Sequence, residues 1–100
     1  MPFEHEAGRL RRLAKDPRTL VFYTGHAEIE RKKDDISKID IANMLGRCSV
    51  SLVEVNKKNG EEEWRSQGTD NDGRKITAVV VIYEDAQEIK VVTTWANEKK

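Results

Sequence analysis

Cysteine is nearly absent from this chain, since Cys48 is the only one among 100 residues. A single cysteine excludes an intrachain disulfide and any metal site built from several cysteines, and it fits a reducing compartment. Cys48 lies between an expected helix end and an expected strand. A lone cysteine in such a place is most often a small buried apolar group, and we expect that role here.

Long apolar stretches are also missing. The longest runs from Ala78 to Tyr83, which is far too short to span a bilayer. The first residues, M-P-F-E-H-E, lack the basic start and the apolar stretch of a signal peptide. The sequence therefore predicts a cytoplasmic protein that does not interact with a membrane.

The chain carries no net charge, because 18 Lys and Arg residues balance 18 Asp and Glu residues. Proteins that bind nucleic acids tend to be basic, so any affinity for RNA has to come from a local patch. Hydrophobic residues make up 37% of the chain, which is enough for one core. We expect residues 1–100 to form a single domain, with a helix within 1–19, a core in 20–96 and a frayed polar tail at 97–100.

Helical spacing of apolar residues marks the first half of the chain. They recur every three or four positions in 3–15, and Asp16-Pro17 ends that pattern. A short strand is expected at 20–23 and a second helix at 26–33. A third helix is expected to begin at Ser37, because the spacing of Ser37 and Asp40 is typical of a helix start, and to stop at Gly46.

Apolar and polar residues alternate in the second half. Strands are expected at 50–55, 62–69, 75–83 and 88–95, and turns rich in Asn, Asp and Gly separate the first three. The order is therefore helix, strand, helix, helix and four strands. This order predicts an α+β fold, in which a mostly antiparallel sheet carries the helices on one side.

Successive side chains of a strand lie on opposite faces of a sheet, so strand parity sorts the residues into two faces. The face expected under the helices carries Trp64, Ile76, Ala78, Val80, Ile82, Ile89, Val91 and Trp95. The open face is expected to carry Arg65, Gln67, Thr77, Tyr83, Lys90 and Thr94. One β-bulge would reverse this assignment within a strand.

Several polar residues of these strands and turns are suited to chemistry on RNA. Cleavage without a metal needs a base for the 2′-hydroxyl, a cation for the phosphate and an acid for the leaving oxygen. Arg65 and Arg74 are candidates for the cation, because a guanidinium suits phosphate. Tyr83 and His26 are candidates for proton transfer, and Gln67 for orienting the phosphate. The alternative is that these are ordinary polar residues of a wet sheet face.

No metal or cofactor is predicted, because no pair of His, Asp or Glu residues has ligand spacing on an expected element. His26 follows Thr24-Gly25 at an expected helix start. The helix dipole there favours a neutral imidazole, so a capping or packing role stands beside the catalytic one.

Three segments carry a family resemblance. The first is F-Y-T-G-H-A-x(8)-I-S, from Phe22 to Ser37, and the second is W-R-S-Q-G-T-D-N-D-G-R, from Trp64 to Arg74. The third is the pair of closing strands, T-A-V-V-V-I-Y and I-K-V-V-T-T-W. Together they resemble the RelE-type mRNA interferase superfamily, in particular BrnT-like and MqsR-like toxins and related uncharacterised domains, over residues 20–95.

The resemblance implies a small RelE-like domain that cleaves mRNA, on the ribosome or free in solution, and that a cognate antitoxin neutralises. The positions that match the family are His26, Gly68, Gly73 and Arg74. The chain departs from the family at Glu30 and Asp34, where related domains often carry arginine. Acidic groups at these positions would repel RNA.

These observations favour a metal-independent mRNA endoribonuclease, the toxin of a toxin–antitoxin pair. Its expected catalytic residues are Arg65, Tyr83 and His26. Its expected RNA-binding residues are Gln67, Arg74, Lys90 and Thr94. The alternative is a non-catalytic relative with the same fold that binds RNA or a protein partner.

Overall fold

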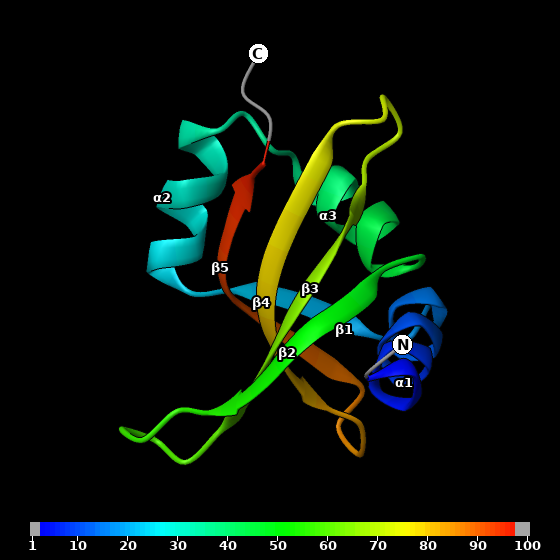
Figure 1. Ribbon diagram of the computed structural model, residues 1–100, viewed down its shortest axis with the longest axis vertical. Coiled ribbons are helices and arrows are strands. Elements are labelled where there is room, and N and C mark those ends of the chain that lie inside the picture. Colours follow the sequence, from blue (N-terminus) through cyan, green and yellow to red (C-terminus); the bar gives the residue numbers. More distant parts are fainter. Residues whose placement is uncertain (1–2, 98–100) are drawn as a thin grey trace.

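Residues 3–97 are described by a computed structural model, in which three helices and five strands follow one another (Figure 1). The helices are α1 (Glu4–Lys15), α2 (Gly25–Lys33) and α3 (Lys38–Leu45). The strands are β1 (Leu20–Tyr23), β2 (Ser49–Val55), β3 (Glu62–Thr69), β4 (Lys75–Tyr83) and β5 (Glu88–Ala96). The predicted α+β fold and its order of elements are confirmed.

The five strands form one sheet in the order β1-β5-β4-β3-β2. Only β1, at one edge, runs parallel to its neighbour β5, and the other three pairs are antiparallel. The helices pack on one side: α2 contacts β5, α3 contacts β3, and α1 contacts β2 and α3. Figure 1 shows the β2–β3 hairpin extending beyond the rest of the sheet. The opposite side, called the open face below, carries no helix within residues 3–97.

Local sequence explains where the helices form. Ala7, Leu10 and Leu13, spaced three apart, make the buried face of α1, which ends at Asp16 before a proline. A capping box starts α3: the Ser37 hydroxyl accepts from the Asp40 backbone N–H, and the Asp40 carboxylate accepts from the Ser37 backbone N–H. Such a cap satisfies backbone donors that the first helical turn leaves unpaired.

The core lies between the helices and the sheet. Its strand side chains include Trp64, Ile76, Ala78, Val80, Ile89 and Val91, all buried as strand parity predicts, and Ile82 packs against them half-buried. Cys48 is buried in the same core, as expected for a small apolar group. No helix in residues 3–97 is long and apolar enough to cross a bilayer.

A β-bulge in β5 overturns two face assignments. Val79 pairs with Thr93 and Val80 with Val91, so Val92 has no partner on β4 and the alternation reverses beyond it. Thr94, expected on the open face, is fully buried on the helix side, and its hydroxyl donates to the Thr77 carbonyl at 2.8 Å.

Trp95, expected in the core, lies on the open face instead for the same reason. It pairs with Thr77 on β4, whose side chain points to that face. The polar tail expected at 97–100 lies outside the described residues except for Asn97, whose backbone N–H donates to the Lys75 carbonyl at 2.9 Å.

Candidate functional site

A groove of about 510 Å³ runs across the open face of the sheet. Side chains from β2, β3, β4 and β5 line it, together with the residue that follows β5. The lining residues are Ser49, Ser51, Arg65, Gln67, Gly68, Thr69, Lys75, Thr77, Trp95 and Asn97. We call this feature the open-face groove.

An arginine and a tryptophan from two different strands meet in the open-face groove. The guanidinium carbon of Arg65 on β3 lies 5.8 Å from the centre of the Trp95 ring on β5. Arg65 is exposed and Trp95 is half-buried, so the pair offers solvent a flat surface that is both aromatic and cationic. The bulge in β5 creates this pair, because it turns Trp95 to the open face.

Among residues 3–97, no acidic side chain lines the open-face groove, although the chain has as many acids as bases. Arg65 and Lys75 supply its positive charge. Within residues 3–97, no ion pair joins either of them to a carboxylate. The charged side chains of the described lining are therefore all cationic in a molecule of zero net charge, as suits an anion-binding site.

Hydrogen bonds hold the polar side chains of the groove in place. The Gln67 amide donates to the Ser49 hydroxyl at 2.8 Å, which ties β3 to β2. The hydroxyl of the buried Thr77 donates to the Asn97 side-chain oxygen at 2.7 Å. Both amides can form further hydrogen bonds, so the walls offer fixed polar groups beside the Arg65–Trp95 pair.

Tyr83 and Lys90 lie together elsewhere on the open face, where Glu61 links them. The Lys90 ammonium lies 2.5 Å from one Glu61 oxygen, and the Tyr83 hydroxyl donates to the other. The hydrogen bond from Lys90, followed by that from Tyr83, lowers the pKa of Glu61, and Glu61 in turn raises the pKa of both donors. The Phe22 ring stacks on Tyr83 with 6.4 Å between centres. Neither Tyr83 nor Lys90 lines the groove.

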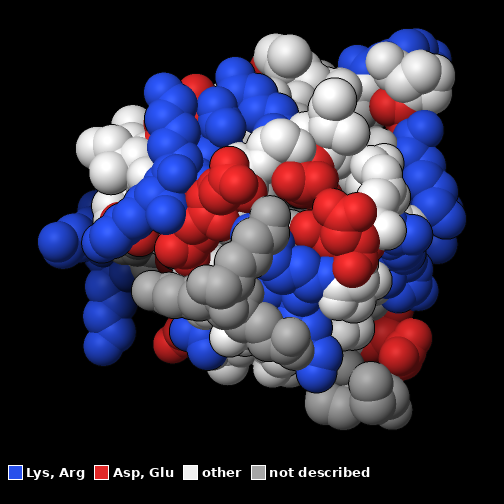
Figure 2. Space-filling model, turned by 90° about the horizontal axis from the view of Figure 1, so that it is seen from above, with Lys and Arg blue, Asp and Glu red and all other residues white. Residues whose placement is uncertain are grey.

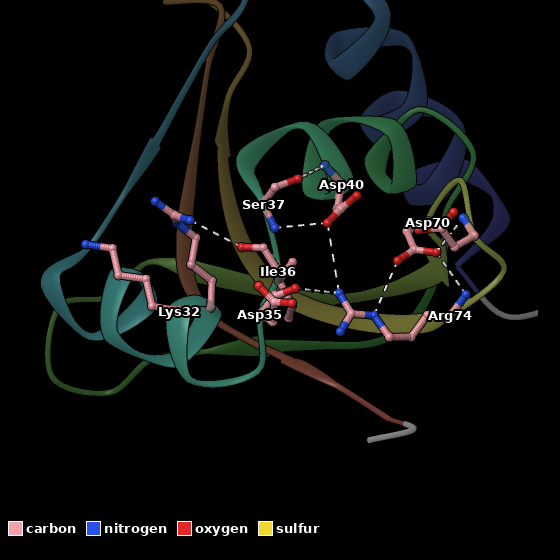
Figure 3. A pocket seen from close by; sticks show the side chains of 9 residues that line it. Lys32, Asp35, Ile36, Ser37, Asp40, Asp70 and Arg74 are labelled. Carbon is pink, nitrogen blue, oxygen red and sulfur yellow. Dashed lines mark hydrogen bonds and ion pairs between the residues drawn. The ribbon is translucent and has the colours of Figure 1, made fainter. Parts of the chain in front are cut away.

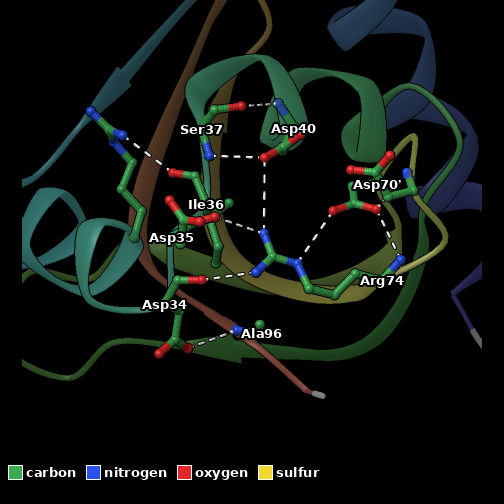
Figure 4. A network of polar contacts seen from close by, with 10 residues as sticks. Asp34, Asp35, Ile36, Ser37, Asp40, Asp70, Arg74 and Ala96 are labelled. Carbon is green, nitrogen blue, oxygen red and sulfur yellow. Dashed lines mark hydrogen bonds and ion pairs between the residues drawn. The ribbon is translucent and has the colours of Figure 1, made fainter. Parts of the chain in front are cut away.

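Arg74 lies outside the groove, in a pocket of about 400 Å³ beside the start of α3 (Figure 3). Its guanidinium donates to the carbonyls of Asp34 and Asp35 at 2.9 and 2.8 Å, and to the Asp70 carboxylate at 3.3 Å (Figure 4). The Asp40 carboxylate lies 3.9 Å away. The arginine thus ties the α2–α3 loop to the β3–β4 turn.

Aspartates line the Arg74 pocket together with Arg31 and Lys32. Figure 2 looks onto this end of the molecule and shows Asp and Glu gathered across the middle, with Lys and Arg on both sides. Asp34, expected to repel RNA, has a structural role here, because its carboxylate accepts the Ala96 backbone N–H at 2.9 Å. Its backbone carbonyl binds Arg74 as well, so Asp34 joins β5 to the same network.

His26 is exposed in the first turn of α2. The cap of this helix is Thr24, whose hydroxyl accepts the Ala27 backbone N–H at 3.0 Å and donates to the Val92 carbonyl at 2.9 Å. His26 lines neither the open-face groove nor the Arg74 pocket. Within residues 3–97, no group of three or more His, Cys, Asp or Glu residues is placed to hold a metal ion.

The structure therefore divides the predicted site. Arg65 and Gln67 share the open-face groove, and Tyr83 and Lys90 share a second cluster. The others lie apart: His26 on α2, Arg74 among its aspartates and Thr94 in the core.

Among the residues of the open-face groove that sequence reasoning missed are its aromatic residue, Trp95, and its second cation, Lys75. Lys75 precedes Thr77 by two positions, so strand parity would have placed it on the same face. No comparable signal marked Trp95, since the bulge that exposes it leaves no pattern in the sequence.

Comparisons with known proteins add no relative to this picture. No family model matches the chain, and searches of curated proteins and of solved structures find no match. The resemblance to RelE-type toxins stays a prediction, and function has to be argued from the geometry of the groove.

Proposed function

We propose that this protein binds single-stranded RNA in the open-face groove. The observation that carries the proposal is the exposed Arg65 guanidinium over the Trp95 ring, in a groove that no acidic side chain of residues 3–97 lines. Proteins that bind single strands combine a positive groove for the backbone with aromatic surfaces on which unpaired bases stack. The open-face groove has both parts within one pocket.

Each lining group suits one part of a nucleotide. A base stacks on Trp95 or on the guanidinium plane of Arg65, and both contacts require a base free of a duplex. Lys75 and the remaining donors of Arg65 pair with phosphate. Hydroxyl and amide groups, such as those of Ser51 and Gln67, suit the ribose 2′-hydroxyl, which distinguishes RNA from DNA.

Binding is the function that the geometry supports best, and cleavage remains a separate prediction. The three expected catalytic residues lie in three places, and only Arg65 lines the groove. No histidine in the part of the chain that the structure describes lines the groove, and histidine is the residue best suited to transfer protons near neutral pH. Among residues 3–97, the ionisable residues that line the groove are Arg65 and Lys75.

Fluorescence anisotropy of a labelled single-stranded RNA, measured over a range of KCl concentrations, tests the proposal. We expect Trp95→Leu to weaken binding by about 1–3 kcal/mol, the value of one base stack. We expect Arg65→Ala to weaken binding and to reduce the slope of log K against log salt by about 0.7, the loss of one phosphate contact. Lys33→Ala, which removes an exposed cation of α2, is the matched control and should change little.

The measurements distinguish RNA binding from the absence of binding, and binding alone from cleavage. If wild-type protein does not retain RNA at low salt, or if both groove variants bind as the wild type does, the proposal is wrong. RNA shortened on a denaturing gel by wild-type protein, and left intact by Arg65→Ala, would extend binding to the predicted endoribonuclease. The antitoxin partner implied by the resemblance is a further prediction, which co-expression with the adjacent reading frame addresses.

A further inference from the structure

A second pocket, which no acidic side chain among the described residues lines, lies at the ends of two helices, and we call it the helix-end pocket. It measures about 430 Å³, and its lining includes Lys15, Asn43, Gly46, Arg47 and Asn71, with two alanines. Lys15 is the last residue of α1, and Arg47 follows the C-cap of α3. The Arg47 guanidinium donates to the Asn71 side chain at 3.0 Å.

The two pockets lie on either side of one short stretch of backbone. Arg47 lines the helix-end pocket and Ser49 lines the open-face groove, with only Cys48 between them. On the neighbouring segment, Asn71 lines the helix-end pocket and Thr69 lines the open-face groove. Two residues of extended chain span roughly 6–7 Å, so the pockets are close enough for one strand of RNA to reach both.

The carboxylate that lies between the pockets does not interrupt this path. Asp70 separates Thr69 from Asn71, but it is only 4% exposed and is paired with Arg74. A further cation lies on the other side, since the Arg11 guanidinium donates to the Cys48 carbonyl at 2.7 Å. Asp70 therefore does not present a free carboxylate between the pockets, and Arg11 adds a cation beside Cys48.

The cations of the helix-end pocket are available to a ligand. Within residues 3–97, no ion pair joins Lys15 or Arg47 to a carboxylate. A lysine in the last turn of a helix interacts favourably with the helix dipole, which accounts for Lys15 taken alone. It does not account for the absence of acidic residues from the described lining of the pocket, which includes Arg47 just beyond α3.

We propose that the helix-end pocket is a second phosphate-binding site for the same single-stranded RNA, which passes from Arg65 and Trp95 around the edge of the sheet to Arg47 and Lys15. This inference rests on the proposed function of the open-face groove. It gives the bound RNA a direction across the molecule. It also makes affinity depend on length, because a short strand fills the groove alone and a longer one reaches both pockets.

Two oligouridylates separate the groove from the helix-end pocket. Labelled strands of about 4 and about 12 nucleotides bracket the site of a small single-strand-binding domain. We expect the double variant Lys15→Ala/Arg47→Ala to weaken binding of the longer strand about fivefold or more and to reduce its salt slope by about 1.4, the loss of two phosphates. Binding of the short strand should be unchanged.

Controls keep a folding defect apart from a binding defect. The double variant Lys33→Ala/Lys57→Ala removes two exposed cations that line neither pocket, and it should bind both strands as the wild type does. Arg47→Lys should keep most of the affinity for the longer strand that Arg47→Ala loses. Circular dichroism melting should show every variant folded. Arg47→Glu should weaken binding of the longer strand further than Arg47→Ala.

The outcomes for this inference and for the proposed function are distinguishable. If Arg65→Ala weakens binding of both strands while Lys15→Ala/Arg47→Ala weakens binding of neither, the groove binds RNA and the helix-end pocket does not. If the double variant weakens both strands equally, the path proposed here is wrong. If wild-type protein binds neither strand, the proposed function itself fails, and the second site fails with it.

Discussion

Arg65 on β3 reaches over β4 to the ring of Trp95 on β5, with 5.8 Å between the guanidinium carbon and the ring centre. The two residues belong to strands that do not pair with each other. Their contact therefore depends on the alignment of three strands and on the bulge at Val92. It is the central feature of the open-face groove.

The Arg65–Trp95 contact should contribute little to stability. A cation–aromatic contact whose cation is exposed, as Arg65 is, is worth about 0.5–1 kcal/mol, so we expect Arg65→Ala to lower the free energy of unfolding by about that amount. Urea denaturation followed by circular dichroism measures it. A loss above about 2 kcal/mol would give Arg65 a structural role and would make its effect on RNA binding ambiguous.

The alternation of apolar residues was sufficient to predict the strands but not the full assignment of their faces. The faces of β3 and β4 follow from residues such as Trp64 and Val80, whose burial the pattern shows. In β5, two valines and then two threonines stand side by side, so the pattern does not reveal which residue leaves the ladder. The bulge at Val92 exchanges the faces of Thr94 and Trp95, and Trp95 was missed as a residue of the open face for that reason.

Arg74 shows a second limit of prediction from the sequence, because it binds groups of its own protein where a phosphate-binding role was expected. Its acceptors include the carbonyls of Asp34 and Asp35, about 40 positions earlier in the chain. Backbone carbonyls of a loop leave no side-chain pattern to read. From the sequence alone, an arginine after a glycine-containing turn looks equally suited to phosphate and to its own protein.

Arg74 is expected to be a main contributor to stability. Its side chain is 11% exposed and that of Asp70 is 3% exposed, so removing the arginine leaves a buried carboxylate unpaired. We expect Arg74→Ala to lower the free energy of unfolding by about 3 kcal/mol, measured by urea denaturation. Arg74→Lys keeps the charge but loses the planar fork, and it should fall between the wild type and Arg74→Ala. A loss below about 1 kcal/mol for Arg74→Ala would contradict this role.

The same pair should make stability depend on pH in the acid range. Burial alone would raise the pKa of Asp70, but the backbone N–H groups of Arg74 and Asp72 and the Arg74 guanidinium outweigh it and hold that pKa below its ordinary value of 3.8. The folded state then binds fewer protons here than the unfolded state. The stabilisation is complete above the ordinary pKa and is lost as the pH falls through the folded value.

Asp70→Asn isolates this contribution. Other carboxyl groups titrate alike in both proteins, so their effects cancel in the difference between the two unfolding free energies. We expect the free energy of unfolding of wild type to exceed that of Asp70→Asn by more at pH 6 than at pH 3. Urea denaturation at each pH measures both values. An equal difference at both values would show that the charge of Asp70 does not stabilise the fold.

The Cys48 thiol should be unreactive in the folded protein. Burial raises its pKa to about 11, against the opposing charge of Arg11, which leaves roughly one thiol in a thousand ionised at pH 8. Access is restricted too, because Cys48 is 1% exposed. We expect labelling by a disulfide reagent at pH 8 to be slow in buffer and complete within minutes in denaturant, because in buffer it has to wait for opening of the structure. The double variant Cys48→Ala/Ser51→Cys, with its thiol at an exposed position of β2, should react quickly while folded, and equally fast labelling of wild type would show that the region around α3 and β2 opens readily.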